Sequence, residues 1–169
     1  MDTIESILTR RSIRQYTAQK VPEDKVKRIL QAAMYAPSAM NLQPWHFIVI
    51  DRKELIEGLI KAIPHADMLK QAPLVIIYCG DTNVERNVDY IVQDCSASIE
   101  NSLLAAHAIG LGAVWIGIYP DTAIIENLRK HFELPANIIP VSAVAIGFPS
   151  EVKDTENRYN SGKIHINKW

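Results

Sequence analysis

Residues 87–120, NVDYIVQDCSASIENSLLAAHAIGLGAVWIGIYP, decide how the rest of the chain is interpreted. From about Asn87 to Ile109, apolar side chains recur at steps of four, which predicts one long helix. Gly110 stands where such a helix ends most readily, because glycine adopts the left-handed conformation without strain. An apolar strand is expected directly afterwards, over residues 113–118. A long helix joined by a short turn to a strand predicts a layered domain in which the helix packs on a sheet.

On either side of this stretch, strands and helices alternate. Buried strands are expected at Trp45–Ile50, Leu74–Cys79 and Val141–Gly147. Amphipathic helices are expected from Asp2 to about Arg10, from Pro22 to before Pro37, around residues 55–60, and after Asp121. This order fits a parallel doubly wound sheet as readily as an α+β fold, and periodicity leaves both open.

The composition describes one ordinary globular domain. The chain has 169 residues, of which 48% are hydrophobic and 22% are charged. A formal net charge of −1 supplies no global field that would attract nucleic acid or an anionic membrane. The sequence shows neither a leader pattern at Met1 nor an apolar run long enough to span a bilayer, so a cytoplasmic location is expected. Cys79 and Cys95 are expected to be buried thiols.

The residues after Pro149 are polar and form a tail to the domain. Within this tail, residues 163–166 alternate like an edge strand, and the chain ends in Trp169. Such a tail needs another surface to cover it.

A basic run near the start, RRSIR, offers one candidate binding site. Arg10, Arg11 and Arg14 place three guanidinium groups beside the hydroxyl of Ser12, and arginine matches phosphate oxygens in geometry and charge. The alternative is that these cations complement a helix end and remain solvated. A nucleic-acid or anion-binding module could use the same run.

A second candidate is the proline-bounded loop Pro37–Trp45, between a helix and a strand. Amide side chains such as Asn41 and Gln43 offer both donors and acceptors, which suit the edge of a heterocycle such as flavin. An ordinary turn with side-chain capping would have the same composition.

A third candidate is the glycine-containing segment 110–120. Gly117 lies within a predicted strand, which indicates a bulge or a close approach of the backbone to another group. It is not a dinucleotide fingerprint, because the glycines precede a strand instead of opening a helix. A helix end followed by a strand would explain the same residues.

Other common chemistries find little support in the sequence. The five histidines show no spacing typical of metal ligands, and Ser38 has no evident base partner. Asp89 and Asp94 are expected to be charges on the surface of the long helix.

Four segments in combination resemble the nitroreductase family, in its short-chain branch, over almost the whole chain. They are RRSIRQY (10–16), APSAMNLQPWHF (36–47), QDCSASIENSLLAAHAIGLGAVWIGIYP (93–120) and ENRY with IHINKW (156–159 and 164–169). The resemblance implies an α+β fold, with a mainly antiparallel central sheet flanked by helices. It also implies one domain over residues 1–169 and an intertwined homodimer, in which the C-terminal extension 150–169 wraps the partner and can extend its sheet.

The resemblance further implies two non-covalent flavin mononucleotide (FMN) sites at the subunit interface. The first FMN-binding segment corresponds to Arg10, Arg11, Ser12 and Arg14, with Arg158 returning from the tail toward the phosphate. The loop that the partner lays along the flavin corresponds to Pro37, Ser38, Ala39, Met40 and Asn41, with Gln43 as a neighbour. The backbone at Ile116 and Gly117 corresponds to the strand end near flavin N5 and O4.

The implied activity is an FMN-dependent oxidoreductase that passes electrons from NADH or NADPH to a small acceptor, such as a nitroaromatic compound or a quinone, by a ping-pong mechanism. No side chain is expected to act as acid or base, because flavin N5 carries the chemistry. A non-catalytic flavin-binding or flavin-storage protein is the alternative.

Overall fold

The computed structural model describes all residues, 1–169. Its helices are α1 (Thr3–Thr9), α2 (Glu23–Met34), α3 (Lys53–Ala62), α4 (Val88–Ala108) and α5 (Thr122–His131), and its strands are β1 (Trp45–Ile50), β2 (Leu74–Asp81), β3 (Gly112–Gly117) and β4 (Ile138–Gly147). The strand order is β1-β2-β4-β3, and all neighbouring strands are antiparallel. The fold is therefore α+β, and the parallel doubly wound alternative is excluded.

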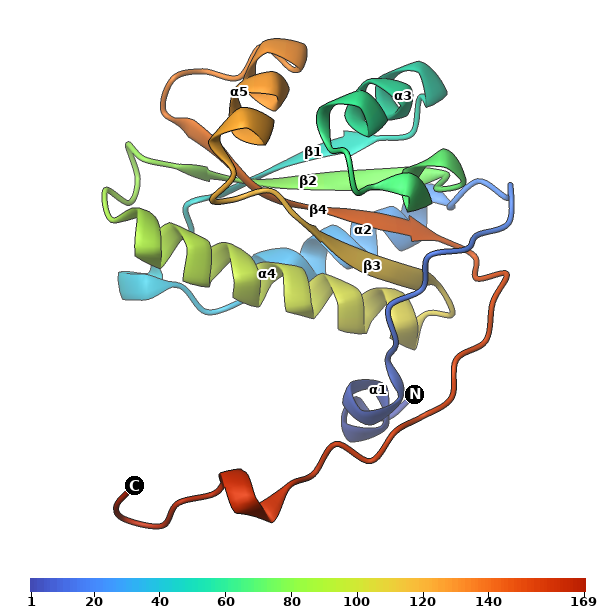
Figure 1. The fold of residues 1–169 in the computed structure, drawn as a ribbon, viewed down its shortest axis with the longest axis vertical. Helices are drawn as coiled ribbons and strands as arrows, with labels where there is room; N and C mark the ends of the chain where they lie inside the picture. Colours follow the sequence, from blue (N-terminus) through green and yellow to red (C-terminus); the bar gives the residue numbers. More distant parts are fainter.

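The sheet separates two layers of helices. Helices α3 and α5 cover one face, and α2 and α4 cover the other (Figure 1). Strands β2 and β3 run in the same direction with β4 between them, so α4 is the crossover that connects them. Helix α4 contacts all four strands of the sheet.

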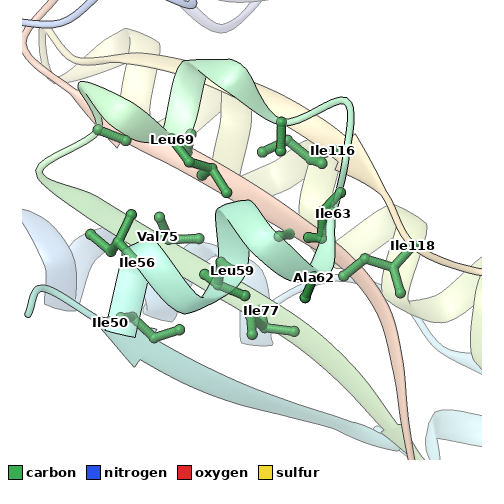
Figure 2. Close-up of a cluster of buried hydrophobic side chains, with 14 of the residues drawn as sticks. Ile50, Ile56, Leu59, Ala62, Ile63, Leu69, Val75, Ile77, Ile116 and Ile118 are labelled. Atoms are coloured by element: carbon green, nitrogen blue, oxygen red, sulfur yellow. The ribbon is translucent and has the colours of Figure 1, made fainter. Parts of the chain in front are cut away.

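The face under α3 is closed by a cluster of branched side chains. Ile56 and Leu59 of α3 lie over Val75 and Ile77 of β2, and all four are buried (Figure 2). A second cluster on the opposite face packs α2 and α4 against the sheet. Burial of this apolar surface is the main force that stabilises the layers.

Helix α4 ends where the glycine predicts. Gly110 has a φ of 82°, Leu111 N donates to Ala106 O at 2.8 Å, and Gly110 N donates to His107 O at 3.0 Å. This pair of hydrogen bonds is a Schellman motif, which satisfies the last carbonyls of the helix. The predicted caps at Asp2 and Asp121 are also confirmed, since each carboxylate accepts two backbone N–H groups.

Two strand expectations need correction. β1 is an edge strand with only its ends buried, because no strand pairs with its outer side and Val49 is 43% exposed. Gly117 forms no bulge; the irregular register lies between β2 and β4, at Tyr78 and Cys79. Cys79 and Cys95 are buried free thiols as expected, and burial raises the pKa of each to about 12.

The two ends of the chain carry apolar side chains without cover. Ile4, Ile7 and Leu8 of α1 are exposed, as are Ile164, Ile166 and Trp169 of the tail. The tail runs past α1 and leaves the body of the domain (Figure 1). Residues 164–166 pair with no strand in this chain, so the predicted edge strand does not form within it. No helix combines the length and apolarity that crossing a membrane requires.

Candidate functional site

The basic segment 10–14 links α1 to the edge of β3. Ser12 forms a parallel bridge with Ala113, and Ile13 N donates to Ala113 O at 3.0 Å. Arg10 turns toward α4, where its Nε lies 3.3 Å from Glu100 Oε1. Arg14 is exposed, and its guanidinium makes no hydrogen bond. The segment is thus fixed through its backbone, and the side chain of Arg14 is exposed to solvent.

A cavity of ≈ 710 Å³ is lined both by this segment and by the tail. Arg10 and Arg11 line one side of it, and residues 155–159, with Arg158, line the other. The three arginines expected at a phosphate therefore share one cavity, although about 150 residues separate them in sequence. Arg158 has Glu156 as its nearest acid, with Nε and Oε2 3.9 Å apart.

Arg11 has a second function that sequence reasoning missed. Its Nε donates to Asp154 O at 2.9 Å, and its Nη1 donates to Leu8 O and Arg10 O. Its Nη2 is buried without a hydrogen-bond partner. Arg11 therefore ties the tail to the end of α1 and keeps one donor available.

Glu151 and Lys153 complete this connection. Glu151 Oε1 accepts from the backbone N–H groups of Arg14 and Gln15, and Lys153 Nζ donates to Ser12 O at 2.8 Å. The Arg14 N–H bond, assisted by Lys153, lowers the pKa of the Glu151 carboxyl below its ordinary value. Nothing in the local sequence pattern signals these contacts, because they join residues more than 130 positions apart.

A histidine on α4 stands behind the basic segment. His107 Nε2 lies 2.8 Å from Thr9 Oγ1, whose hydroxyl donates to Glu5 O at 2.6 Å, so the ring nitrogen acts as the donor. Burial, and then the charges of Arg10 and Arg11, lower the pKa of His107. A neutral His107 therefore braces α1 without adding positive charge.

The loop 37–43 lies against the first half of α4. It contains a 3₁₀ turn over Ala39–Asn41, and Met40, Asn41 and Gln43 all have positive φ. Pro37, Met40, Asn41 and Gln43 are exposed, and Ser38 and Ala39 are half-buried. Gln43 Nε2 donates to Asn41 Oδ1 at 2.9 Å, so the two amides expected to bind a ligand are paired with each other.

For Asp94, the expectation of a charge on the helix surface is wrong. It is not a surface charge: only 6% of it is exposed, and its Oδ1 accepts from Ala39 N at 3.0 Å. Asp89, one turn and a half earlier on α4, is exposed as expected.

Ile116 and Gly117 lie at the end of β3. Ile116 is buried in the cluster beneath α3 and α5, so only its backbone is available to a ligand. Gly117 is exposed, and a Cβ added there would meet nothing within 4 Å. Neither packing nor backbone conformation requires glycine at this position.

Within one chain, the two predicted groups of residues do not meet. Ala39 is bonded to α4 at Asp94, whereas Arg10 of the basic segment contacts Glu100, and Thr9, just before the segment, contacts His107. At 1.5 Å per residue these points lie roughly 9–20 Å apart along the helix. The single chain thus presents two separate half-sites.

The residues present fit an anionic flavin nucleotide. The shared cavity offers three guanidinium groups and an unpartnered Nη2 of Arg11, which suit a phosphate. The uncovered Gly117 allows a planar group to approach the strand end closely. Both features match FMN.

Comparison with known proteins finds related sequences in one family. The model described as "Nitroreductase family" matches residues 7–66 and 61–148. A "Putative NADH dehydrogenase/NAD(P)H nitroreductase" of Methanothermobacter thermautotrophicus is 44% identical over 169 residues, covering 100% of this chain and 88% of that protein.

Solved structures agree with the sequence comparison. An "FMN-dependent Nitroreductase" from Clostridium difficile R20291 superposes with a TM-score of 0.91 at 31% identity, covering 98% of this chain and 99% of the other. A "putative nitroreductase in complex with fmn" from Desulfovibrio desulfuricans has a TM-score of 0.85 at 30% identity, covering 100% and 98%.

Proposed function

Because the chain belongs to the nitroreductase family of oxidoreductases, we propose that it binds FMN non-covalently and passes electrons from NADH or NADPH to a small acceptor, such as a nitroaromatic compound or a quinone, by a ping-pong mechanism. The observation that carries the proposal is the cavity in which Arg10 and Arg11 face Arg158. The related nitroreductase described in complex with FMN supports the choice of cofactor.

In the proposed complex, each of these residues has its own role. Arg10, Arg158 and the unpartnered Nη2 of Arg11 bind the phosphate, and Ser12 follows Arg11 in the chain without lining the cavity. The unpaired guanidinium of Arg14 stabilises negative charge at the pyrimidine edge of the flavin. The backbone at Ile116 and Gly117 supplies donors toward the ring. Bound FMN supplies hydride acceptance and donation, while the protein supplies orientation and electrostatics.

We also propose that the site is completed by a second copy of the chain, whose loop 37–43 faces the flavin. Within one chain, the two half-sites contact α4 at points roughly 9–20 Å apart along the helix. The exposed apolar faces of α1 and of the tail are the type of surface that a partner subunit covers.

The tail has a complementary surface in the same fold. An apolar cavity of ≈ 490 Å³ lies between α2 and the unpaired edge of β1, lined by Val26, Leu30, Met34, Val49 and others. An alternating segment such as 163–166 can add to an unpaired strand edge and place its apolar side chains in such a cavity. In the proposed homodimer, the extension 150–169 of each chain therefore crosses to the other.

Rapid mixing with reduced nicotinamide tests the catalytic part of the proposal. The purified protein is expected to be yellow, and its flavin absorbance near 450 nm is expected to bleach when NADH or NADPH is added and to return when a quinone follows. Retention of full absorbance with both nucleotides would instead favour a flavin-storage protein. A colourless protein whose anion binding weakens steeply with salt would favour a nucleic-acid or anion-binding module.

A further inference from the structure

The loop 37–43 has a conformation that its own sequence disfavours. Met40, Asn41 and Gln43 have φ values of 51°, 57° and 53°, in the left-handed region that non-glycine residues rarely adopt. Within the loop, Gln43 N donates to Ser38 Oγ at 3.0 Å and Leu42 N donates to Ala39 O. A loop in this state persists only where the surrounding structure restrains it.

The two ends of the loop are held by apolar packing on α4. Ala36 before the loop and Trp45 after it are both 8% exposed, and they share a cluster with Ile91 and Cys95. This packing anchors the ends, but it does not reach the middle of the loop, where Met40 is 78% exposed.

One side chain outside the loop is hydrogen-bonded to its middle. Asp94 Oδ1 accepts from Ala39 N at 3.0 Å, at the first residue of the 3₁₀ turn. Asp94 is 6% exposed, it forms no ion pair, and its Oδ2 is buried without a partner. A buried carboxylate without a cation is unfavourable for folding, so its retention requires a compensating role. The N–H of Ala39 is the group that Asp94 contacts.

We propose that Asp94 is a positioning residue of the flavin site, whose buried carboxylate holds the loop 37–43 in the conformation that faces the cofactor. The inference rests on the proposed FMN function. It gives α4 a second role, because the helix that braces α1 through His107 also fixes the loop 37–43 through Asp94. Asp94 acts on the ring of the flavin through the loop, whereas Arg10 and Arg158 act on its phosphate.

Flavin titrations of three variants test this role. Asp94→Ala removes the acceptor, and Asp94→Asn keeps an oxygen in the same place. Asp89→Asn, an exposed change on the same helix, is the matched control. Dissociation constants are measured by fluorescence quenching for FMN and for riboflavin, which lacks the phosphate. Because a hydrogen bond to a charged group is lost, Asp94→Ala is expected to weaken both flavins by a similar factor of about 10.

The conservative variants separate positioning from general stability. The dissociation constants of Asp94→Asn for both flavins are expected to lie within about threefold of the wild-type values. Those of Asp89→Asn are expected to equal the wild-type values. The visible circular dichroism of bound FMN is expected to change in Asp94→Ala and to be restored in Asp94→Asn. Unchanged affinity in Asp94→Ala, a loss confined to FMN, or an equal loss in Asp94→Asn would overturn the proposal.

A change on the donor side covers the case in which Asp94→Ala does not fold. Ala39→Pro removes the N–H at the first position of a 3₁₀ turn, and the extended Ser38 before it (φ −138°, ψ 155°) suits a following proline. It is expected to weaken FMN and riboflavin alike by about 10-fold. Wild-type affinity in this variant contradicts the role of Asp94. A wild-type protein that binds neither flavin contradicts the proposed function instead.

Discussion

At the scale of single residues, the arginines of the shared cavity carry the clearest prediction. The double variant Arg10→Ala, Arg158→Ala is expected to fold and dimerise but to be purified largely without FMN. Charge-assisted hydrogen bonds contribute about 1.5–3 kcal/mol each, so FMN affinity is expected to fall by about 100-fold or more. Flavin content is measured by absorbance after gel filtration.

Riboflavin provides the control for this double variant, because it has no phosphate to lose. The affinity of the double variant for riboflavin is expected to stay near the wild-type value. A second control is Lys61→Ala, which removes an exposed cation on α3 and is expected to leave FMN affinity unchanged. Full retention of FMN by the double variant would show that the cavity does not hold the phosphate.

Glu151 supports a prediction about pH. Its pKa is lowered in the folded protein, so its stabilising effect is complete above the ordinary glutamate value of about 4.3 and is lost as the pH falls through the lower, folded value. Glu151→Gln is expected to lower the free energy of unfolding by about 0.5–1 kcal/mol at pH 7, since the group is partly exposed. Urea denaturation at pH 7, 5 and 3.5 measures the difference, which should shrink at the lowest pH. A difference that is unchanged at pH 3.5 would show that the charge of Glu151 is not its cause.

The sequence indicates which segments could bind a ligand, but it does not predict which residues hold those segments in position. RRSIR and the loop 37–43 are visible as patterns because their chemistry is concentrated in short segments. Asp94, Glu151 and Lys153 are not, because each contacts a residue more than 50 positions away and nothing local distinguishes them from surface charges. Asp94 was expected at the surface for this reason.

At the scale of elements, two glycines have different functions: Gly80 allows a helix to pack on a strand, and Gly117 is proposed to allow the flavin to approach the backbone. A Cβ at Gly80 would overlap Ile91 Cγ2, where α4 packs on β2, so Gly80→Ala is expected to destabilise the protein by about 1–3 kcal/mol. At Gly117 a Cβ meets no neighbour, so Gly117→Ala is expected to change stability by less than about 0.5 kcal/mol but to weaken FMN binding. Chemical denaturation and FMN titration of both variants measure these effects. A wild-type free energy of unfolding in Gly80→Ala would contradict the first expectation, and wild-type FMN affinity in Gly117→Ala would contradict the second.

Helices and strands were predicted well where their signals are local. The boundaries of β1 and the caps of α1 and α5 match, because proline, aspartate and apolar periodicity act within a few residues. The direction and order of the strands could not be derived, since they depend on contacts between distant segments. The edge position of β1 was missed because an apolar run indicates burial without saying which neighbour provides it.

At the scale of the whole molecule, the tail supports a prediction about assembly. Deletion of residues 161–169 is expected to convert the proposed homodimer into monomers and to reduce bound FMN to a small fraction. Removal of Ile164, Ile166 and Trp169 eliminates exposed apolar surface that the proposed partner covers. Light scattering coupled to gel filtration measures the mass, with full-length Lys168→Ala as the control. A full-length protein that is monomeric while saturated with FMN would overturn the composite site.

The faces of α1 and of the tail, which are uncovered in this chain, illustrate what an apolar pattern leaves open. A pattern of apolar residues predicts that a surface is covered, and the fold confirms which surfaces the chain covers by itself. It was the resemblance to a family that pointed to a second subunit.

In the proposed homodimer, the separation of the two half-sites along α4 makes the affinity for FMN depend on the protein concentration. In a site assembled from two chains, bound FMN stabilises the dimer. Equally, dimer formation increases the affinity for FMN. Diluting the protein should therefore release flavin even when the total flavin concentration is held constant. In a cell, the amount of protein would set the fraction of chains that are able to carry electrons.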